Sequence, residues 1–407
     1  MAVKQEYIDI MVNIPGFSVG VVGTADVEVG GKDLMIGLIR RELKYRCHCG
    51  REFTSRYDSR ERCVSDLPFG PWPTSSLVFW QARVDCPDCG IVTEELSWVG
   101  PRVNYTKRLA ASVALACRES RSLKSIARQY RLHVHTVKKM DQEALERDLP
   151  DPSASAPRLL GVDEFSLRKG HHYATVVADL ETVKIPYVAE GRDCESLAGY
   201  YRQLGPEKCE RIEAVAMDMW PAFAEATREH CPQAEIVYDP FHLISAFGRD
   251  VIDVVRAQEY SRAEGEERRV IKGGKYLLLK NKRNLEKSRN EPARLRELLR
   301  LNQKLSEVYV LKDDLKQTWR YRSKAWAEKW LAGWNQRAMK TSIEPLKKFA
   351  RKLKRHLPGI LAHCRFKIHT GLLEGMNNKI KVIKRVSYGF GDMNYFFLKI
   401  RGAFQFG

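Results

Sequence analysis

The sequence predicts an α+β protein of several domains: a β-rich N-terminal part, a short group of helices, and an α/β core that a long helical segment interrupts. The chain has 407 residues, enough for two to four domains of about 100–200 residues each. Hydrophobic residues make up 44% and charged residues 29%, so the chain can bury cores and is not disordered. Along the chain, the hydrophobic pattern changes from alternation to helical periodicity and back.

Charge is distributed very unevenly. Lysine and arginine outnumber acidic residues by 69 to 51, a net charge of +18. Residues 261–407 hold 36 basic and 13 acidic side chains, a net +23, whereas residues 1–260 have a net charge of −5. A positive surface of this size attracts polyanions, and nucleic acid is the usual one. A set of solvated helices is the other interpretation.

Ile10 to Ala25, an uncharged stretch that no other stretch of the chain exceeds in length, contains Pro15 and several glycines. It is too short for a membrane span, which needs about 20 apolar residues. We therefore expect a soluble, cytoplasmic protein that does not bind membranes.

Residues 1–100 are predicted to form a β-rich zinc-binding domain. Val21–Val29 and Leu34–Tyr45 alternate apolar and polar residues around Gly30-Gly31, which predicts a β-hairpin. Two knuckle-like turns then supply four closely spaced thiols: Cys47, Cys49, Cys86 and Cys89. Four thiolates bind zinc in a closed, structural site.

The first cysteine pair has CxC spacing, one residue shorter than the CxxC of the second pair. This leaves His48 or Cys63 as an alternative zinc ligand. Surface cysteines without a metal are the other interpretation of the pattern.

Residues 101–149 are predicted to form a helix-turn-helix. The second helix begins at the cap residue Ser122, and a third, basic helix begins near Val134 after a three-residue turn. Residues 105–140 hold nine basic groups and one acid, which favours DNA binding over a hairpin that serves packing alone. The predicted DNA contacts of the third helix are His135, Thr136, Lys138 and Lys139.

A Pro- and Ser-rich linker at residues 150–157 precedes a change to strand patterns. Residues 158–257 read as three consecutive strands followed by alternating helices and strands. This is the order of a ribonuclease-H-like core. Residues 258–364 are helical and basic and are predicted to be an insertion. Residues 365–407 complete the core with one helix and an aromatic tail.

Four tryptophans of the insertion are spaced by seven, four and four residues: Trp319, Trp326, Trp330 and Trp334. This spacing predicts one helix face that belongs to the core. The alternative is that one tryptophan stacks on a displaced base.

Two acids lie on predicted strands of the core. Asp163 is in the middle of the first strand, where a carboxylate is costly unless a cation pairs with it. Asp218 ends a later apolar strand, at the edge where open α/β sheets bind ligands. Those strands are neighbours in a ribonuclease-H-like sheet, so the acids should converge. Two Mg²⁺ ions, or Mn²⁺ in their place, would make a phosphoryl-transfer site there, with Glu374 as the candidate third acid.

Taken singly, each of these acids is more often a surface or capping residue. Glu164 points to the opposite face of its strand from Asp163 and is not expected to be a ligand. On the late helix, the predicted DNA contacts are Lys381, Lys384 and Arg385.

Several segments together resemble bacterial insertion-sequence transposases of the ISL3 family, which combine a zinc-binding domain, a helix-turn-helix and a DDE core. Beyond the cysteine pairs, they are Gly161–Tyr173, Tyr238–Leu243, Glu374–Arg385 and Tyr388-Gly389-Phe390. One departure is Met219-Trp220, where smaller polar residues are expected.

The resemblance implies that Asp163, Asp218 and Glu374 are the metal-binding triad, with Asp239 and His242 as an accessory element beside them. It implies a transposase that binds the ends of its insertion sequence and catalyses DNA cleavage and strand transfer into target DNA. We expect a nucleoid-associated protein that forms a homodimer or higher oligomer when it pairs two ends. The rivals are a zinc and helix-turn-helix regulator without catalysis, and a ribonuclease-H-like nuclease.

Overall fold

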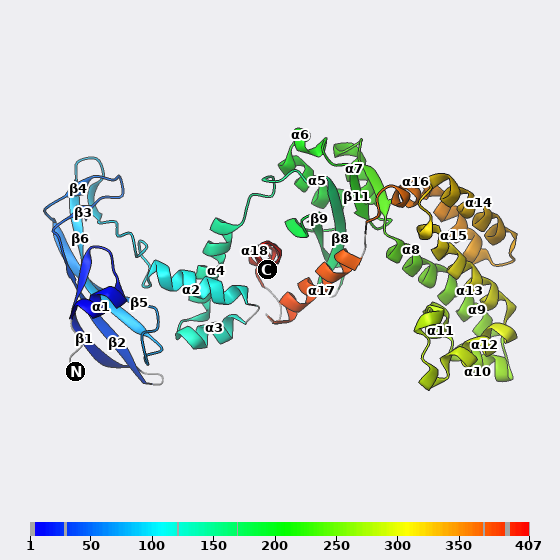
Figure 1. Ribbon diagram of the computed structural model, residues 1–407, viewed down its shortest axis with the longest axis horizontal. Coiled ribbons are helices and arrows are strands. Elements are labelled where there is room, and N and C mark those ends of the chain that lie inside the picture. Colours follow the sequence, from blue (N-terminus) through cyan, green and yellow to red (C-terminus); the bar gives the residue numbers. More distant parts are fainter. Residues whose placement is uncertain are drawn as a thin grey trace. The chain divides into compact units, whose positions relative to one another are not determined.

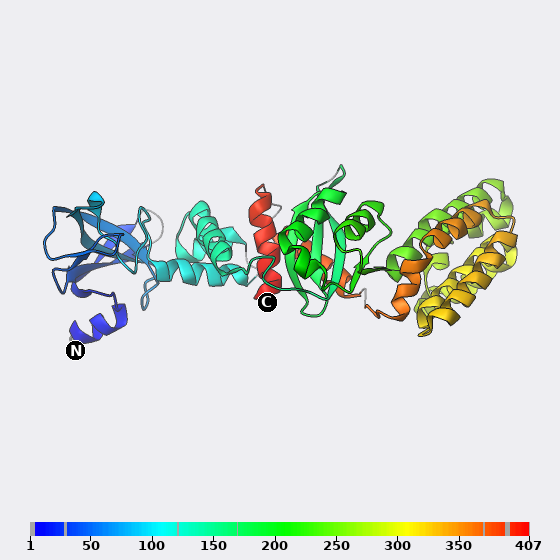
Figure 2. The ribbon, with the colours of Figure 1, turned by 90° about the horizontal axis from the view of Figure 1, so that it is seen from above.

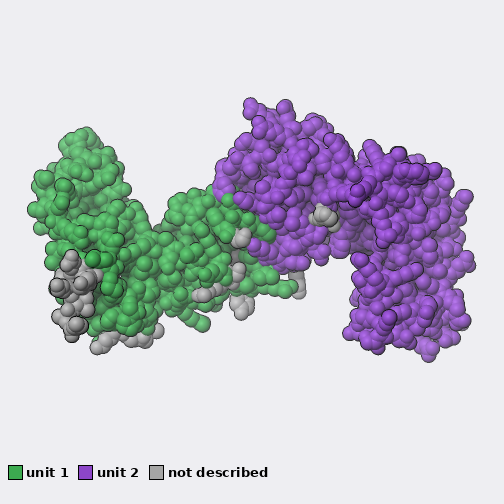
Figure 3. Space-filling view, in the orientation of Figure 1, with its two compact units in different colours: residues 1–149, 382–407 green, residues 150–381 purple. Residues whose placement is uncertain are grey.

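The computed structural model describes residues 5–27, 31–119, 122–168, 170–368, 371–386 and 391–406. The chain divides into two compact units (Figure 3). Unit 1 comprises residues 1–149 and 382–407, and unit 2 comprises residues 150–381. The finer division into six segments stays a prediction.

Unit 1 begins with α1 (Gln5–Val12) and a five-stranded sheet (Figure 1). Its strands are β1 (Phe17–Val27), β2 (Gly31–Arg40), β5 (Asp58–Asp66), β6 (Ser75–Cys86) and β7 (Gly90–Thr93). β1 and β2 form the predicted hairpin, although Gly30 at its turn lies outside the described residues. The second strand ends at Arg40, not at Tyr45 as expected, because Tyr45 begins the separate strand β3 (Tyr45–Arg46).

A group of aromatic rings forms the core under this sheet. Phe79 on β6 packs edge to face against Trp98 and Phe17, with ring centroids 4.8 and 5.9 Å apart. All three side chains are buried. Aromatic pairs in this geometry add to the stability that comes from burying their area.

Three helices follow the sheet: α2 (Lys107–Arg118), α3 (Leu123–Tyr130) and α4 (Val134–Asp148). Ser122 caps α3, since its side chain accepts a hydrogen bond from Ser125 N at 3.2 Å. Arg131 then takes a left-handed conformation with φ of 50°, which ends α3 and permits the tight turn before α4. The start of the second and third helices is where the sequence predicts it.

The C-terminal segment is a helix, not the expected aromatic tail. Asp392 accepts a hydrogen bond from Tyr395 N at 3.0 Å and begins α18 (Met393–Gln405). α18 packs against α4 within unit 1. Lys399 Nζ lies 2.9 Å from Asp141 Oδ2 on α4, and the Tyr395 hydroxyl donates to the same carboxylate, which is 1% exposed. α18 therefore packs on the helix-turn-helix through α4.

Unit 2 contains a second five-stranded sheet, in the order β10-β9-β8-β11-β12. Its strands are β8 (Leu159–Arg168), β9 (His172–Asp179), β10 (Lys184–Glu190), β11 (Ala214–Met217) and β12 (Glu235–Tyr238). β9 is antiparallel to both of its neighbours, β8 and β10, whereas β8, β11 and β12 are parallel. This matches the predicted succession of three strands followed by alternating helices and strands.

Helices cover both faces of this sheet. Val162 and Val215 point into a core with α5 (Cys194–Leu204) and α7 (Pro221–His230). The short helix α6 (Pro206–Cys209) follows α5. Ala214, Ala216 and Val237 instead pack against Phe366 and Ile368 on the opposite face. Alternate residues of β11 thus face opposite sides, as a strand buried on both faces requires.

After β12 the chain is helical. α8 (Pro240–Phe247) runs through a π-helical turn, Gly248–Asp253, into α9 (Val254–Arg262). The helices that follow form a bundle (Figure 2): α10 (Gly265–Lys272), α11 (Lys275–Leu279), α12 (Glu291–Leu301), α13 (Gln303–Lys316), α14 (Lys324–Lys340), α15 (Glu344–Arg355) and α16 (Leu357–Leu361). One apolar core extends from the sheet into this bundle. No helix in the described part of the chain has the length and hydrophobicity to cross a membrane.

The tryptophan prediction is correct only in part. Trp334 on α14 is fully buried, and its Nε1 donates to the carbonyl of Leu311 at 2.7 Å. Trp319 lies in a separate 3₁₀ turn before α14, and Trp326 is 61% exposed. The break at residues 321–323 interrupts the helical period on which the prediction depended.

Replacing Lys399 with Met should destabilise α4, because it leaves the buried Asp141 carboxylate without its positive partner. The expected cost is about 3 kcal/mol, as for other broken buried ion pairs. Hydrogen exchange of the α4 amides in the full chain measures it. Lys124→Met on the exposed face of α3 is the control, with a change of about 0.5 kcal/mol or less. Unchanged α4 exchange in Lys399→Met would show that the contact does not stabilise the helix.

Candidate functional site

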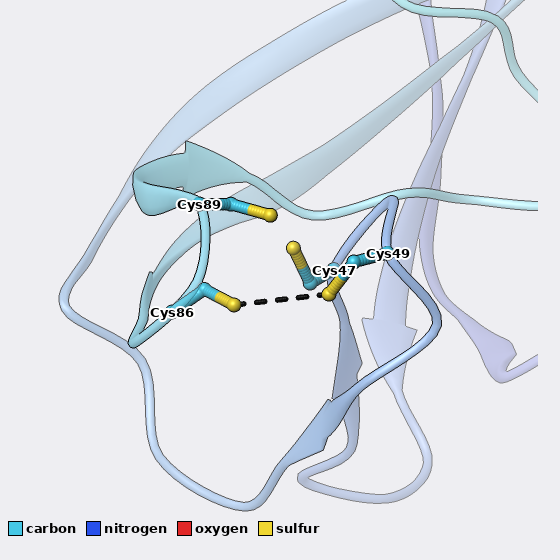
Figure 4. A group of neighbouring side chains, drawn as sticks. All are labelled: Cys47, Cys49, Cys86 and Cys89. Carbon is cyan, nitrogen blue, oxygen red and sulfur yellow. Dashed lines mark hydrogen bonds between the residues drawn. The ribbon is translucent and has the colours of Figure 1, made fainter.

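Two hairpin turns bring the four predicted zinc ligands together (Figure 4). One turn joins β3 to β4 (Glu52–Phe53), and the other joins β6 to β7. Gly50 and Gly90 follow the cysteine pairs with φ of +92° and +71°, a conformation that favours glycine. The four sulfur atoms lie within 4.8 Å of one another, and Cys49 Sγ is 3.8 Å from Cys86 Sγ.

These distances suit a tetrahedral metal site. Zn–S bonds of about 2.3 Å place thiolates about 3.8 Å apart around a zinc ion. Cys63 is not in the cluster; it lies on β5, opposite Val78 of β6. Hydrogen bonds from Arg51 N and the Cys47 thiol lower the pKa of Cys49 to about 7, which favours the metal-binding thiolate.

The third helix of the helix-turn-helix presents some of its predicted DNA contacts to solvent. His135 and Lys139 are exposed, and Thr136 is partly exposed. Lys138 instead faces α18, where its Nζ lies 2.7 Å from Asp392 Oδ2. DNA contact by these four residues stays a prediction. Lys138 would have to leave the Asp392 carboxylate in order to bind a DNA phosphate.

Asp163 and Asp218 lie level with each other on neighbouring parallel strands. Gly161 of β8 pairs with Ala216 of β11, and each acid follows two residues later. Because side chains alternate with a period of two, both acids lie on the face of the sheet that carries Ala216. Asp163 is 8% exposed, and Asp218 is partly buried.

The acids continue along the same edge of the sheet. Met217 of β11 pairs with Tyr238 of β12, so Asp218 and Asp239 are level as well. Asp239 caps α8 by accepting a hydrogen bond from Phe241 N at 2.6 Å. His242 Nε2 lies 3.7 Å from Asp239 Oδ2.

This group of acids is electrostatically strained. Burial raises the pKa of Asp163, and the negative charges of Asp218 and Asp239 add to the rise, while His242 opposes it. Burial also raises the pKa of Asp218, against the opposing effects of His242 and Arg192. Desolvated carboxylates that repel one another are stabilised by a bound cation.

The helix α17 (Gly371–Val386) packs on the same face. Leu373 contacts β8 at Gly161, where a Cβ would lie 2.7 Å from Leu373 Cδ2, so a larger residue there would force the Leu373 side chain to shift. One turn further, Asn377 Nδ2 donates to Asp163 Oδ2 at 2.6 Å. Glu374 lies between these two residues in sequence and is exposed. Among the described residues the cysteines form a group that could hold a metal, whereas Asp163, Asp218 and Glu374 do not.

Sequence reasoning missed Asn377. Helical spacing could have pointed to it. Asn377 is four residues after Leu373 and three after Glu374, so the three side chains are neighbours on the surface of one helix. Glu164 lies on the opposite strand face, and its Oε2 is buried without a hydrogen-bond partner in the described structure. Burial, followed by the charges of Asp218 and Asp163, raises the pKa of Glu164 to about 7.

The remaining predicted contacts are on the second half of α17. Lys381 and Arg385 are exposed, and Lys384 is partly exposed. Their contact with DNA stays a prediction. Tyr388-Gly389-Phe390 lies outside the described residues.

Comparison with known proteins identifies the family. Residues 160–400 match a family of transposases, and residues 94–144 match the helix-turn-helix domain of transposase family ISL3. The chain is 41% identical to the transposase for insertion sequence element IS1001 of Bordetella parapertussis, over 88% of this chain and 87% of that protein. It is 28% identical to the transposase for insertion sequence element IS1557 of Mycobacterium tuberculosis, over 86% and 84% of the two chains.

The predicted family is thus confirmed by matches that cover the helix-turn-helix, the sheet with its acids, the helical bundle and α17. These matches do not favour a regulator without catalysis. The chain belongs to the ISL3 family of transposases.

Proposed function

We propose that this transposase binds the ends of its insertion sequence and cleaves and joins DNA at a metal-dependent DDE site in a ribonuclease-H-like core. The observation that carries the proposal is the level placement of Asp163 on β8 and Asp218 directly after β11, with α17, the helix that contains Glu374, packed on the same face through Leu373. A regulator has no use for buried carboxylates at a sheet edge.

The donor set fits hard divalent cations. Carboxylate oxygens are the ligands that Mg²⁺ and Mn²⁺ prefer. Asp163, Asp218 and Glu374 would together hold two such ions. When bound, such ions activate a water or a DNA 3′-hydroxyl and stabilise the leaving oxygen.

Other side chains of this face hold the acids in place. The amide of Asn377 stabilises the charged form of Asp163 and ties α17, with Glu374, to the sheet. Asp239 and His242 would form the accessory element, since His242 offsets the negative charge of the neighbouring acids.

The rest of the chain would bind DNA. The exposed side chains of α4 would read the transposon end in the major groove, and a zinc ion on the four cysteines would stabilise the neighbouring sheet. The +23 segment at residues 261–407 would contact phosphates without sequence preference. Pairing two ends would need a homodimer or a higher oligomer at the bacterial nucleoid.

Asp163→Asn, Asp218→Asn and Glu374→Gln should each reduce Mg²⁺-dependent cleavage of end DNA by at least about 10³-fold, because each removes a charged metal ligand. End binding should stay within about twofold of wild type. Gel assays of both activities with the full chain test this. Glu181→Gln, at an exposed turn after β9, is the matched control and should cleave normally. Normal nicking by one of the three variants would remove that residue from the triad.

The purified chain should contain one zinc ion, and Cys86→Ser should lose it, because a closed site needs all four thiolates. Cys63→Ser, in the same sheet but outside the cluster, should keep it. Mass spectrometry of metal content measures both. Zinc-free wild type that stays folded would refute the assignment.

Removing charge from α15 should weaken binding to all DNA equally. Lys348, Lys354 and Arg355 are exposed there, and each lost phosphate contact should make the log–log salt slope shallower by about 0.9. Replacing His135 and Lys139 by Ala should instead reduce the preference for transposon ends. Fluorescence anisotropy at several salt concentrations separates the two. Loss of end preference in the α15 variant would reverse this assignment of roles.

A further inference from the structure

Arg192 lies at the same edge of the sheet as the acids. β8 and β10 are both antiparallel to β9, so β10 ends at the edge where β8 and β11 end. Gly191 follows β10 with φ of +97° and donates its N–H to the carbonyl of Tyr173 at 2.8 Å. Arg192 comes directly after this turn and therefore lies at the same edge of the sheet as Asp218.

Two aromatic rings hold the Arg192 guanidinium. Its Cζ lies 4.2 Å from the ring centroid of Tyr173 and 4.4 Å from that of Trp220. Trp220 Nε1 donates to the carbonyl oxygen of Arg192 at 2.7 Å, and Trp220 N donates to Asp218 Oδ1 at 3.0 Å. One tryptophan therefore fixes both the cation and the carboxylate.

The N–H groups of this guanidinium have no acceptor among the described residues. In the described part of the chain, it makes neither an ion pair nor a hydrogen bond, although Arg202 on the adjoining α5 is paired with Glu195. Glu164 is nearby, yet its buried Oε2 accepts no hydrogen bond. Stacking on aromatic rings occupies the faces of a guanidinium and leaves its in-plane N–H groups for an anion.

We propose that Arg192 is a positioning residue that binds the non-bridging oxygens of a DNA phosphate beside the acids. This inference rests on the proposed function. A phosphate that approaches Asp163 and Asp218 meets negative charge, and a rigid, bidentate cation at this edge offsets that repulsion. The proposal also gives a role to Trp220, which lies two residues after Asp218, where the family resemblance leads us to expect a smaller polar residue.

Single-turnover cleavage of end DNA by the full chain with Mg²⁺ tests the proposal. Arg192→Ala should slow cleavage by about 10²-fold or more, as expected when one donor to a reacting phosphate is lost. Arg192→Lys should recover only part of this rate, because an ammonium cannot bind in a bidentate manner. Arg202→Ala is the matched control and should cleave within about twofold of wild type.

A second measurement separates phosphate binding from a structural role. Neutral methylphosphonates are placed singly along the end DNA. One position should slow wild type but cause no further loss in Arg192→Ala, since the contact is already missing. If Arg192→Ala fails to fold, judged by thermal unfolding, Arg192→Lys is scanned in its place and should show a reduced effect at that position.

The outcomes are distinct. Wild-type rates in Arg192→Ala, with Asp163→Asn inactive, would overturn the inference and leave the proposed function intact. A slow variant that keeps the full effect of every methylphosphonate would show that Arg192 only supports the fold, which also overturns it. A wild-type chain that cleaves no end DNA with any divalent metal would overturn both.

Discussion

The parallel pairing of β8 with β11 is the contact on which the proposed catalytic site depends. Its register brings Asp163 level with Asp218 and turns both toward the face on which α17 packs. A slip of one residue would turn Asp163 toward α5 and α7 and away from Asn377. Apolar packing on both faces opposes such a slip, because Val162 and Val215 fill one core and Ala214 and Ala216 the other. The apolar residues of these two strands thus hold the buried Asp163 and the partly buried Asp218 close together despite their repulsion.

The second constraint is electrostatic. The protein must keep several carboxylates at one edge of a sheet and still bind DNA, which is itself negatively charged. The acids lie at one edge of the sheet, while residues 261–407 carry a net +23. Part of that charge is used internally, since Lys399 neutralises Asp141 under the helix-turn-helix. Arg192 differs, because among the described residues its guanidinium stacks on aromatic rings and forms no ion pair. A basic side chain that is paired within the protein, such as Lys399, stabilises the fold. One that lacks such a partner in the described part of the chain, such as Arg192, is available to bind DNA.

Local patterns predict much of this structure. Strand patterns locate the first hairpin and the strands of the second sheet, the cap and the turn locate the starts of α3 and α4, and cysteine spacing finds the four thiols that cluster. These patterns do not locate the strands β5, β6 and β7 of the first sheet individually. The misses involve partners that are distant in sequence. Lys138 lies on a basic helix, and only α18 reveals its pairing with Asp392. α18 itself looks like a tail because aromatic residues obscure its helical period. The contacts of Asn377 with Asp163 and of Arg192 with Trp220 join segments that are distant in sequence, so only the folded structure reveals them.

Anomalous diffraction from crystals of the full chain with Mn²⁺ and end DNA tests the central claim most directly. We expect two manganese peaks about 3.5–4 Å apart, with carboxylate oxygens of Asp163 and Asp218 as ligands and Glu374 completing the set. Asn377 should then have released the oxygen of Asp163 that binds the metal. Manganese at other residues, with Asp163 still hydrogen-bonded to Asn377 and no metal beside Asp218, would contradict this account.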